Sequence, residues 1–216
     1  MKSLFCCPLC GAPLDREEQR WSCPNRHSFD RAAAGYVHLL PANKKHSQDP
    51  GDDKAMVAAR SAFLEKGWYA PLRGALCQAV AEYAVNFPDP VLVDSGCGEG
   101  YYTVGLFQAL SAAELSPQIA GVDLSKAALR RAAKRLPEGE FAVASAYHLP
   151  LPDKSADVLV DIFSPLAAGA PALRAVLLRR PLRTAPVGDE GGPLLKPLRK
   201  PGEAGGLPRL SLAQCA

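Results

Sequence analysis

Three cysteines and a histidine near the start of the chain have the spacing of metal ligands. Cys7 and Cys10 are separated by two residues, and Cys23 and His27 by three. Each pair can point two ligand atoms at one ion, and four such ligands suit a tetrahedral structural zinc. Cys6 is an alternative to Cys7, because a Cys-x3-Cys spacing is also compatible with zinc, but we favour Cys7. The predicted zinc ligands are Cys7, Cys10, Cys23 and His27.

A second group of residues could bind a nucleotide-type cofactor. The apolar run 91–94 leads into the glycine-rich segment 96–100, and residues 101–107 then read as a helix. A glycine turn between a strand and a helix lets a ligand approach the backbone and meet the helix N-terminus. Asp94 can orient this turn or accept a hydrogen bond from a cationic amino group. The next apolar run ends at Asp123, where an acid normally holds ribose hydroxyls.

The glycine spacing discriminates between cofactors. Dinucleotide binding requires G-x-G-x-x-G, but Tyr101 occupies the position of the third glycine. The chain also has no G-x-x-x-x-G-K string, which argues against a phosphate-binding P-loop. The pattern D-x-G-x-G-x-G at residues 94–100 resembles instead the class I S-adenosylmethionine methyltransferases, with Asp123 in their ribose-binding position.

Alternating strands and helices must position this turn. Short apolar runs and helical periodicity predict strands at 91–94, 119–123, 141–144 and 157–162, and helices at 101–107 and 126–135. This alternation argues for an α/β fold, a Rossmann-like parallel sheet preceded by a small zinc-binding domain. Two further helices are expected before the sheet. The first starts at Asp53, carries Met56, Phe63 and Leu64 at helical spacing and closes at Gly67, and the second opens at Pro71.

Several motifs taken together resemble one family. They are the four-ligand cluster, the turn Asp49-Pro50-Gly51-Asp52, the joint Gly67-Trp68-Tyr69-x-Pro71-Leu72-Arg73 and the motif at 94–103. This combination is similar to the large-subunit rRNA guanine-N1 methyltransferases and their macrolide-resistance relatives, over residues 5 to about 166. The resemblance implies zinc on the four ligands and cofactor contacts from Tyr69, Gly98 and Glu99. Together with the residues indicated by the glycine-rich motif and the strand after it, the predicted cofactor-binding residues are Tyr69, Asp94, Gly96, Gly98, Glu99 and Asp123.

The reaction implied by the resemblance is S-adenosylmethionine-dependent methylation of guanine N1 in a 23S rRNA hairpin, at position 745 or, in the resistance branch, 748. Guanine N1 lies on the Watson–Crick edge, so an enzyme must act on a loop or turn the base out of a stem. Methyl transfer from a sulfonium depends on alignment of donor and acceptor. No residue is a convincing base for the N1 proton, because an acid within a strand, such as Asp161, is more often buried or ion-paired than catalytic.

Composition divides the chain into four segments. Residues 1–40 are predicted to form a zinc-binding RNA-recognition module, 41–52 a linker, 53–166 the S-adenosylmethionine-binding domain and 167–216 a Pro/Gly/Arg-rich tail. Trp21 is expected to help supply the small apolar patch around the ion. The linker has almost no large apolar residue, and Lys44 and Lys45 within it could contact phosphates or simply be solvated.

The tail departs from the pattern of the domain before it. After Phe163 no Phe, Tyr, Trp or Ile occurs, and only residues 172–180 could form a short helix. The four strands found are fewer than such a sheet needs, and the family's Gly-Pro-x-His element is absent. The tail therefore reads as an out-of-frame or degenerate end, or as a disordered basic segment that binds RNA. An open sheet with an uncovered apolar face predicts poor solubility and little methyl transfer.

Composition also limits location and partners. The N-terminus has no apolar run of the kind a secretory signal needs, and no stretch approaches the roughly 18 apolar residues of a membrane span. We expect a soluble cytoplasmic protein with 23S rRNA as partner, no membrane association and a homodimer as one assembly state to test. The net charge of +3 neither requires nor excludes nucleic acid. Two alternatives stay open: a non-catalytic zinc RNA-binding protein, and a small-molecule methyltransferase whose zinc clip is purely structural.

Overall fold

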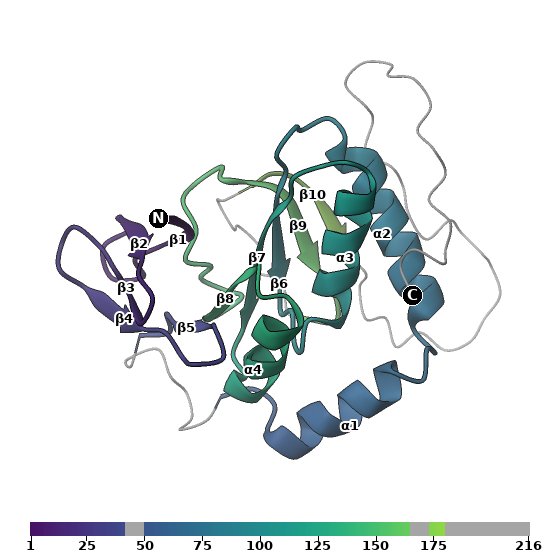
Figure 1. Cartoon of the computed structure of the whole chain (residues 1–216), viewed down its shortest axis with the longest axis horizontal. Coiled ribbons are helices and arrows are strands. Elements are labelled where there is room, and N and C mark those ends of the chain that lie inside the picture. Colours follow the sequence, from purple (N-terminus) through teal and green to yellow (C-terminus); the bar gives the residue numbers. More distant parts are fainter. Residues whose placement is uncertain (42–49, 165–172, 180–216) are drawn as a thin grey trace.

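The computed structural model describes residues 1–41, 50–164 and 173–179 of the 216-residue chain, the last range as backbone alone. Its centre is a parallel sheet of six strands, drawn in Figure 1, in the order β10-β9-β6-β7-β8-β5. Their bounds are β5 Val37–His38, β6 Val91–Ser95, β7 Gln118–Asp123, β8 Glu140–Val143, β9 Ala156–Asp161 and β10 Leu173–Arg179. The predicted α/β fold with a parallel sheet is confirmed.

The strand order creates the site at which a cofactor can bind. From β6 the chain proceeds to β7 and then β8 on one side, whereas β9 pairs with the opposite side of β6. Ligands of open α/β sheets bind outside the carboxyl ends of the strands where the strand order reverses. The glycine turn follows β6 directly, so it lies at this reversal.

Four helices connect these strands: α1 Lys54–Leu64, α2 Ala70–Ala84, α3 Tyr101–Ala112 and α4 Lys126–Arg135. Local sequence sets their starts, because the side chain of Asp53 accepts a hydrogen bond from the Met56 amide and a proline lies in the first turn of α2. The bounds of α4 match the predicted helix. In α1, however, Val57 and Ser61 are buried with Leu64, and Met56 and Phe63 are exposed. None of the helices in the described ranges is long and apolar enough to cross a membrane.

Alternating strand residues divide the core between the two faces of the sheet. Leu92 and Val158 pack with the cluster formed by α2, α3 and α4. Val93 and Leu159, one position further along the same strands, pack with a second cluster that contains Phe5, Leu14 and Trp21. This alternation is the period-2 geometry of strands. The second face is therefore covered by the N-terminal module, and the expectation of an uncovered apolar face is wrong.

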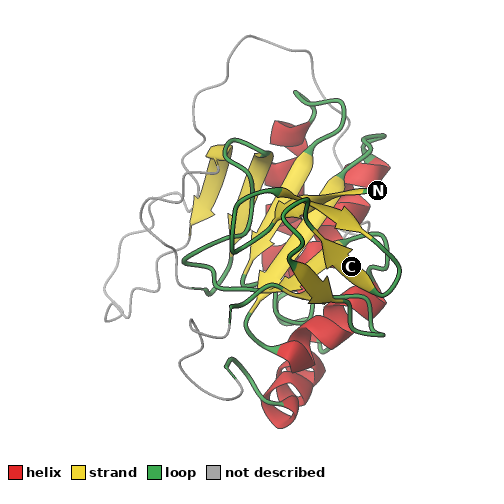
Figure 2. Ribbon diagram, turned by 90° about the vertical axis from the view of Figure 1, so that its left-hand side faces the viewer, coloured by secondary structure: helices red, strands yellow, loops and turns green. Residues whose placement is uncertain are grey.

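The N-terminal module, called the ribbon below, is an antiparallel sheet of β1 (Lys2–Cys6), β2 (Pro13–Arg16), β3 (Arg20–Ser22) and β4 (Ser28–Asp30). In Figure 2, which looks from the side of the ribbon, its strands overlie those of the large sheet. Trp21 is fully buried and packs with Cys7 and Cys23, in agreement with the prediction that it helps to form the apolar patch of this module. The chain then enters the large sheet through β5, whose Val37 pairs with Ala142 of β8.

The expectation of no strand beyond residue 163 is also wrong. β10 spans Leu173–Arg179, inside the segment for which the sequence allowed a short helix, and pairs in parallel with β9. An apolar run of this length is ambiguous between helix and strand by periodicity alone. The open edge of β9 offers a hydrogen-bond ladder, which decides the conformation. Lys44, Lys45 and the tail from residue 180 onward lie outside the described residues.

Candidate functional site

The four predicted metal ligands converge in the ribbon. The sulfurs of Cys7, Cys10 and Cys23 and the Nδ1 of His27 all lie within 4.8 Å of one another. Nδ1 of His27 is 3.5 Å from the sulfurs of both Cys7 and Cys23, and the Cys10 and Cys23 sulfurs are 3.7 Å apart. A tetrahedral zinc with Zn–S of about 2.3 Å and Zn–N of about 2.0–2.1 Å separates its ligands by roughly 3.5–3.8 Å. The donor set therefore fits zinc in chemistry and spacing.

Two tight turns produce this convergence. The amide of Gly11 donates to the carbonyl of Cys7, and Gly11 adopts a φ of +71° that glycine tolerates at little cost. On the opposite side, the amides of Cys23 and Arg26 close a turn around the second pair of ligands. Cys6 is outside the cluster because it belongs to β1, where its amide donates to the carbonyl of Pro150. The choice of Cys7 over Cys6 agrees with this geometry.

A pocket of about 450 Å³ lies beside the glycine turn, at the carboxyl end of the sheet. Five of the six predicted cofactor-binding residues line it: Tyr69, Gly96, Gly98, Glu99 and Asp123. They come from segments up to about fifty residues apart, so the strand order brings them together. Pocket volumes of this size are typical of small-molecule sites.

Asp94, the sixth residue, is buried beneath the turn and is not part of the pocket lining. Its carboxylate accepts a hydrogen bond of 2.5 Å from the hydroxyl of Thr103 in α3. Burial raises the pKa of Asp94 to about 7, and the Thr103 hydrogen bond opposes that rise. In this position Asp94 ties the end of β6 to α3, which is the turn-orienting role that its sequence position allowed.

Asp123 holds the turn from the neighbouring strand. One carboxylate oxygen accepts from the amide of Gly98 at 2.9 Å, and the other accepts from the amide of Ser125 at 2.7 Å. Burial raises its pKa, and these two backbone hydrogen bonds counteract the rise. A Cβ built on Gly98 would meet no atom within 4 Å, so the backbone of the turn is open to the pocket.

Glu99 is the most unusual acid of the site, because its carboxylate is only 2% exposed. Its Oε2 accepts from the guanidinium of Arg60 in α1 at 3.1 Å, and Arg60 also forms an ion pair with Asp52. Its Oε1 is buried without a hydrogen-bond partner among the described residues. A buried carboxylate oxygen without a donor is costly, so this atom suits a ligand that brings one.

Sequence reasoning missed several residues of the pocket. Arg60, in the helix expected after Asp53, and Asp52, in the predicted linker, are not among the residues predicted to bind the cofactor. The pocket is also lined by the aromatic rings of Phe63, Tyr147 and Phe163. An arginine within an otherwise apolar helical pattern was the one available signal for Arg60, because such a charge needs a partner if it faces the protein.

Comparison with known proteins agrees with this geometry. A family model described as "RlmA, N-terminal" matches residues 5–48, and one described as "Methyltransferase domain" matches residues 92–183. The chain is thus similar to an RlmA zinc ribbon in its first segment and to a methyltransferase domain in its second. The ribbon match contains all four clustered ligands, and the methyltransferase match contains the glycine turn and Asp123. The methyltransferase match also runs past residue 166 and includes β10.

Two curated relatives cover most of the chain. A protein from Micromonospora griseorubida, provisionally named a 23S rRNA (guanine-N1) methyltransferase, is 37% identical over 191 residues. The 23S rRNA (guanine(748)-N1)-methyltransferase of Streptomyces fradiae is 37% identical over 174 residues. Each alignment covers 79% of this chain, and 61% and 58% of the respective relative. The chain thus spans about three fifths of the length of these relatives.

Among solved structures, the chain is similar to DesVI of Streptomyces venezuelae, with 24% identity and a TM-score of 0.39. The match covers 53% of this chain and 44% of DesVI. A TehB-like S-adenosylmethionine-dependent methyltransferase from Corynebacterium glutamicum has 18% identity and a TM-score of 0.36, covering 50% of this chain and 54% of that one.

The cofactors of the zinc ribbon and the methyltransferase domain are zinc and S-adenosylmethionine. The pocket fits the second of these. S-adenosylmethionine carries an ammonium group and two ribose hydroxyls, all of which donate hydrogen bonds. The carboxylate acceptors of the pocket belong to Glu99, which is buried, and Asp123, which is partly buried, and the backbone at Gly98 is open. Donor and acceptor chemistry therefore match.

Proposed function

We propose that this chain transfers the methyl group of S-adenosylmethionine to N1 of a guanine in a 23S rRNA hairpin, at position 745 or 748. The observation that carries the proposal is the combination, in one chain, of the Cys3His cluster and the pocket at the glycine turn. Two relatives that align with 79% of the chain are named for guanine-N1 methylation of 23S rRNA, and the Streptomyces fradiae enzyme for position 748.

In this proposal Tyr69, Gly96, Gly98, Glu99 and Asp123 hold the cofactor, and Asp94 contributes indirectly by fixing the turn. S-adenosylmethionine supplies an electrophilic methyl group on a sulfonium. The residues of the chain align that group with the incoming base, and alignment supplies a large part of the acceleration of such a displacement. Phe63, Tyr147 and Phe163 line the pocket and are exposed, so we place its opening at these rings, and the base would enter there.

The ribbon would bind the RNA stem near this opening. It is packed on one face of the sheet, so the ribbon and the pocket hold a fixed relation to each other. RNA hairpins are recognised by shape and by unstacked bases, and a rigid two-part surface can read both. We further propose that the protein acts in the cytoplasm, where 23S rRNA is available, and that light scattering will test whether it forms a homodimer.

Methyl transfer to RNA tests the function directly. The zinc-loaded full chain is incubated with tritiated S-adenosylmethionine and a hairpin RNA containing nucleotides 745–748 of 23S rRNA. We expect tritium in the RNA and a reverse-transcription stop at the methylated guanine, because a methyl on N1 blocks Watson–Crick pairing. A hairpin with adenine at both candidate positions is the matched control and should take up no label.

Two other outcomes would contradict the proposal, and a third would leave the reaction standing but show that it is impaired. RNA binding without binding of S-adenosylmethionine by calorimetry would indicate a non-catalytic zinc RNA-binding protein. Transfer to small acceptors but not to the hairpin would indicate a small-molecule methyltransferase. Turnover far below that of the Streptomyces fradiae enzyme, assayed in parallel, would support the expectation that the C-terminal segment impairs activity.

A further inference from the structure

Aromatic side chains without a structural role gather at the mouth of the pocket. Phe63 at the end of α1 is 46% exposed and Phe163, just after β9, is 47% exposed, and both line the pocket. Neither belongs to the two apolar clusters that form the core of the described structure. Large exposed aromatic rings beside a cavity are characteristic of sites that bind flat ligands.

Tyr69 links these two phenylalanines. Its ring centroid lies 5.8 Å from that of Phe63 and 5.8 Å from that of Phe163, at interplanar angles of 64° and 83°. Both contacts are edge contacts rather than face-to-face stacks, so Tyr69 supports each phenylalanine without covering it completely. About half of the surface of each phenylalanine remains accessible to a third ring.

The backbone at Phe163 is held in an unusual conformation. Its φ is +57°, in the left-handed region that bulky residues rarely adopt. The following residue, Ser164, packs over the glycine turn so closely that a Cβ on Gly96 would come within 2.3 Å of the Ser164 Cβ. The segment after β9 therefore packs against the glycine turn. Strain of this kind persists where the surrounding structure enforces it, frequently at a functional site.

We propose that Phe163, supported by Tyr69 and flanked by Phe63, stacks on the target guanine once that base has left its own helix. This inference rests on the proposed function and assigns it an acceptor site. A guanine presents its N1 on one edge and two flat faces. Stacking on Phe163 would hold one face while the edge points toward the glycine turn, where Ser164 joins the two segments. Proteins hold unstacked RNA bases by stacking them on aromatic side chains and by hydrogen bonds to the base edges.

The experiment compares Phe163→Leu and Phe63→Leu with the parent chain. Leucine keeps an apolar contact on Tyr69 but removes the flat ring. Phe87→Leu is the matched control, because Phe87 also packs on a tyrosine, Tyr83, at 5.5 Å, and neither residue lines the pocket. Phe163→Tyr retains the ring and serves as the conservative rescue. Methyl transfer, S-adenosylhomocysteine binding and melting temperature are measured for all five proteins.

We expect Phe163→Leu to raise KM for the hairpin about tenfold, in line with the effect of losing one base–aromatic stack. Phe63→Leu should raise it less, whereas Phe163→Tyr and Phe87→Leu should remain within about twofold of the parent. Affinity for S-adenosylhomocysteine should change less than about twofold throughout. A hairpin with 2-aminopurine at the target position should fluoresce more brightly with Phe163→Leu than with the parent, because stacking on the ring quenches it.

The outcomes separate this inference from the function on which it rests. If the parent transfers no methyl group to the hairpin, the proposed function is wrong and the acceptor site is wrong with it. If the parent is active but Phe163→Leu matches it in KM and in 2-aminopurine fluorescence, only the acceptor site is wrong. An equal loss in Phe163→Leu and Phe163→Tyr would also overturn it, since tyrosine keeps the ring.

Discussion

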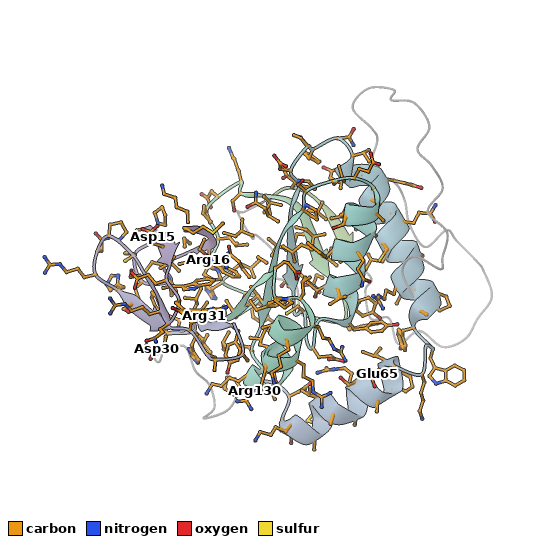
Figure 3. All side chains as sticks on the ribbon, in the orientation of Figure 1. Asp15, Arg16, Asp30, Arg31, Glu65 and Arg130 are labelled. Carbon is orange, nitrogen blue, oxygen red and sulfur yellow. The ribbon has the colours of Figure 1, made fainter. Side chains whose placement is uncertain are left out.

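Arg16 of the ribbon and Glu140 of the large sheet form a mostly buried ion pair, with the guanidinium nitrogen 2.8 Å from the carboxylate. Arg16 lies on the side of the ribbon that faces the sheet (Figure 3). The other oxygen of Glu140 accepts from the hydroxyl of Ser3 at 2.6 Å and from the amide of Leu4 at 3.0 Å. One acid at the start of β8 thus satisfies three donors of the ribbon and fixes the ribbon on the sheet.

Replacing this acid should therefore destabilise the protein measurably. Glu140→Ala leaves the three donors without their acceptor, and we expect a loss of about 1–3 kcal/mol in the free energy of unfolding, measured by urea denaturation. Glu17→Ala is the control, because Glu17 forms an exposed pair with Arg20 that should contribute less than about 1 kcal/mol. Equal effects of the two substitutions would show that Glu140 does not anchor the ribbon.

Removal of a zinc ligand should expose the sheet as well as unfold the ribbon. Cys10→Ser removes one sulfur of the cluster, at the surface of the ribbon. Loss of a residue that only hydrogen-bonds to a metal ligand lowers metal affinity roughly 10–100-fold, and loss of the ligand itself should lower zinc affinity by more. The ribbon covers Val93 and Leu159, so binding of a hydrophobic dye should increase. Cys6→Ser should retain its zinc, measured by metal analysis, because Cys6 is outside the cluster. Loss of zinc from Cys6→Ser but not from a Cys7→Ser variant would reverse the ligand assignment.

Loss of the arginine beside Glu99 should weaken cofactor binding. Arg60→Ala leaves a buried carboxylate without its charged partner, and we expect roughly tenfold or weaker affinity for S-adenosylhomocysteine in calorimetry. Arg130→Ala, on the exposed face of α4 and labelled in Figure 3, should bind as the parent does. Unchanged affinity in Arg60→Ala would show that Glu99 contributes nothing to the binding of this ligand.

The buried carboxyl of Asp94 should make stability depend on pH. Its pKa is about 7 in the folded protein against 3.8 as the ordinary value, so the proton is bound more tightly in the folded state. The contribution of this group to stability is complete below about pH 4 and is lost as the pH rises through about 7. At about 1.4 kcal/mol per pKa unit, this decline in the free energy of unfolding is at most roughly 4 kcal/mol. The Asp94→Asn variant should not show the decline, because an asparagine side chain cannot ionise.

Urea denaturation between pH 4 and 8 measures this difference. Asp89→Asn is the control, because Asp89 is exposed and its substitution should leave the profile of the parent unchanged. All three proteins share the zinc ribbon, so the pH dependence of metal binding cancels in the comparison. Parallel profiles for Asp94→Asn and the parent would contradict the raised pKa.

Much of the local structure follows from the sequence because it depends on neighbours along the chain. The spacing of Cys7 and Cys10 permits one turn that aims both sulfurs at an ion, and the glycines after Asp94 permit the turn at the end of β6. Helix α4 begins after its capping Ser125 and keeps its predicted bounds. Strand β10 is the counterexample, since its ladder with β9 rather than its own composition decides its conformation.

The sequence by itself thus predicted four side chains that cluster as zinc ligands would, the alternation of strands and helices, and five of the residues that line the pocket. Only the tertiary structure decided that the ribbon covers a face of the sheet, that Arg60 neutralises Glu99, and that Ser164, next to Phe163, packs over the glycine turn. The physical reason is separation along the chain. Glu140 and Arg16 are 124 residues apart, and Arg60 and Glu99 are 39 apart, so no local pattern records that they meet.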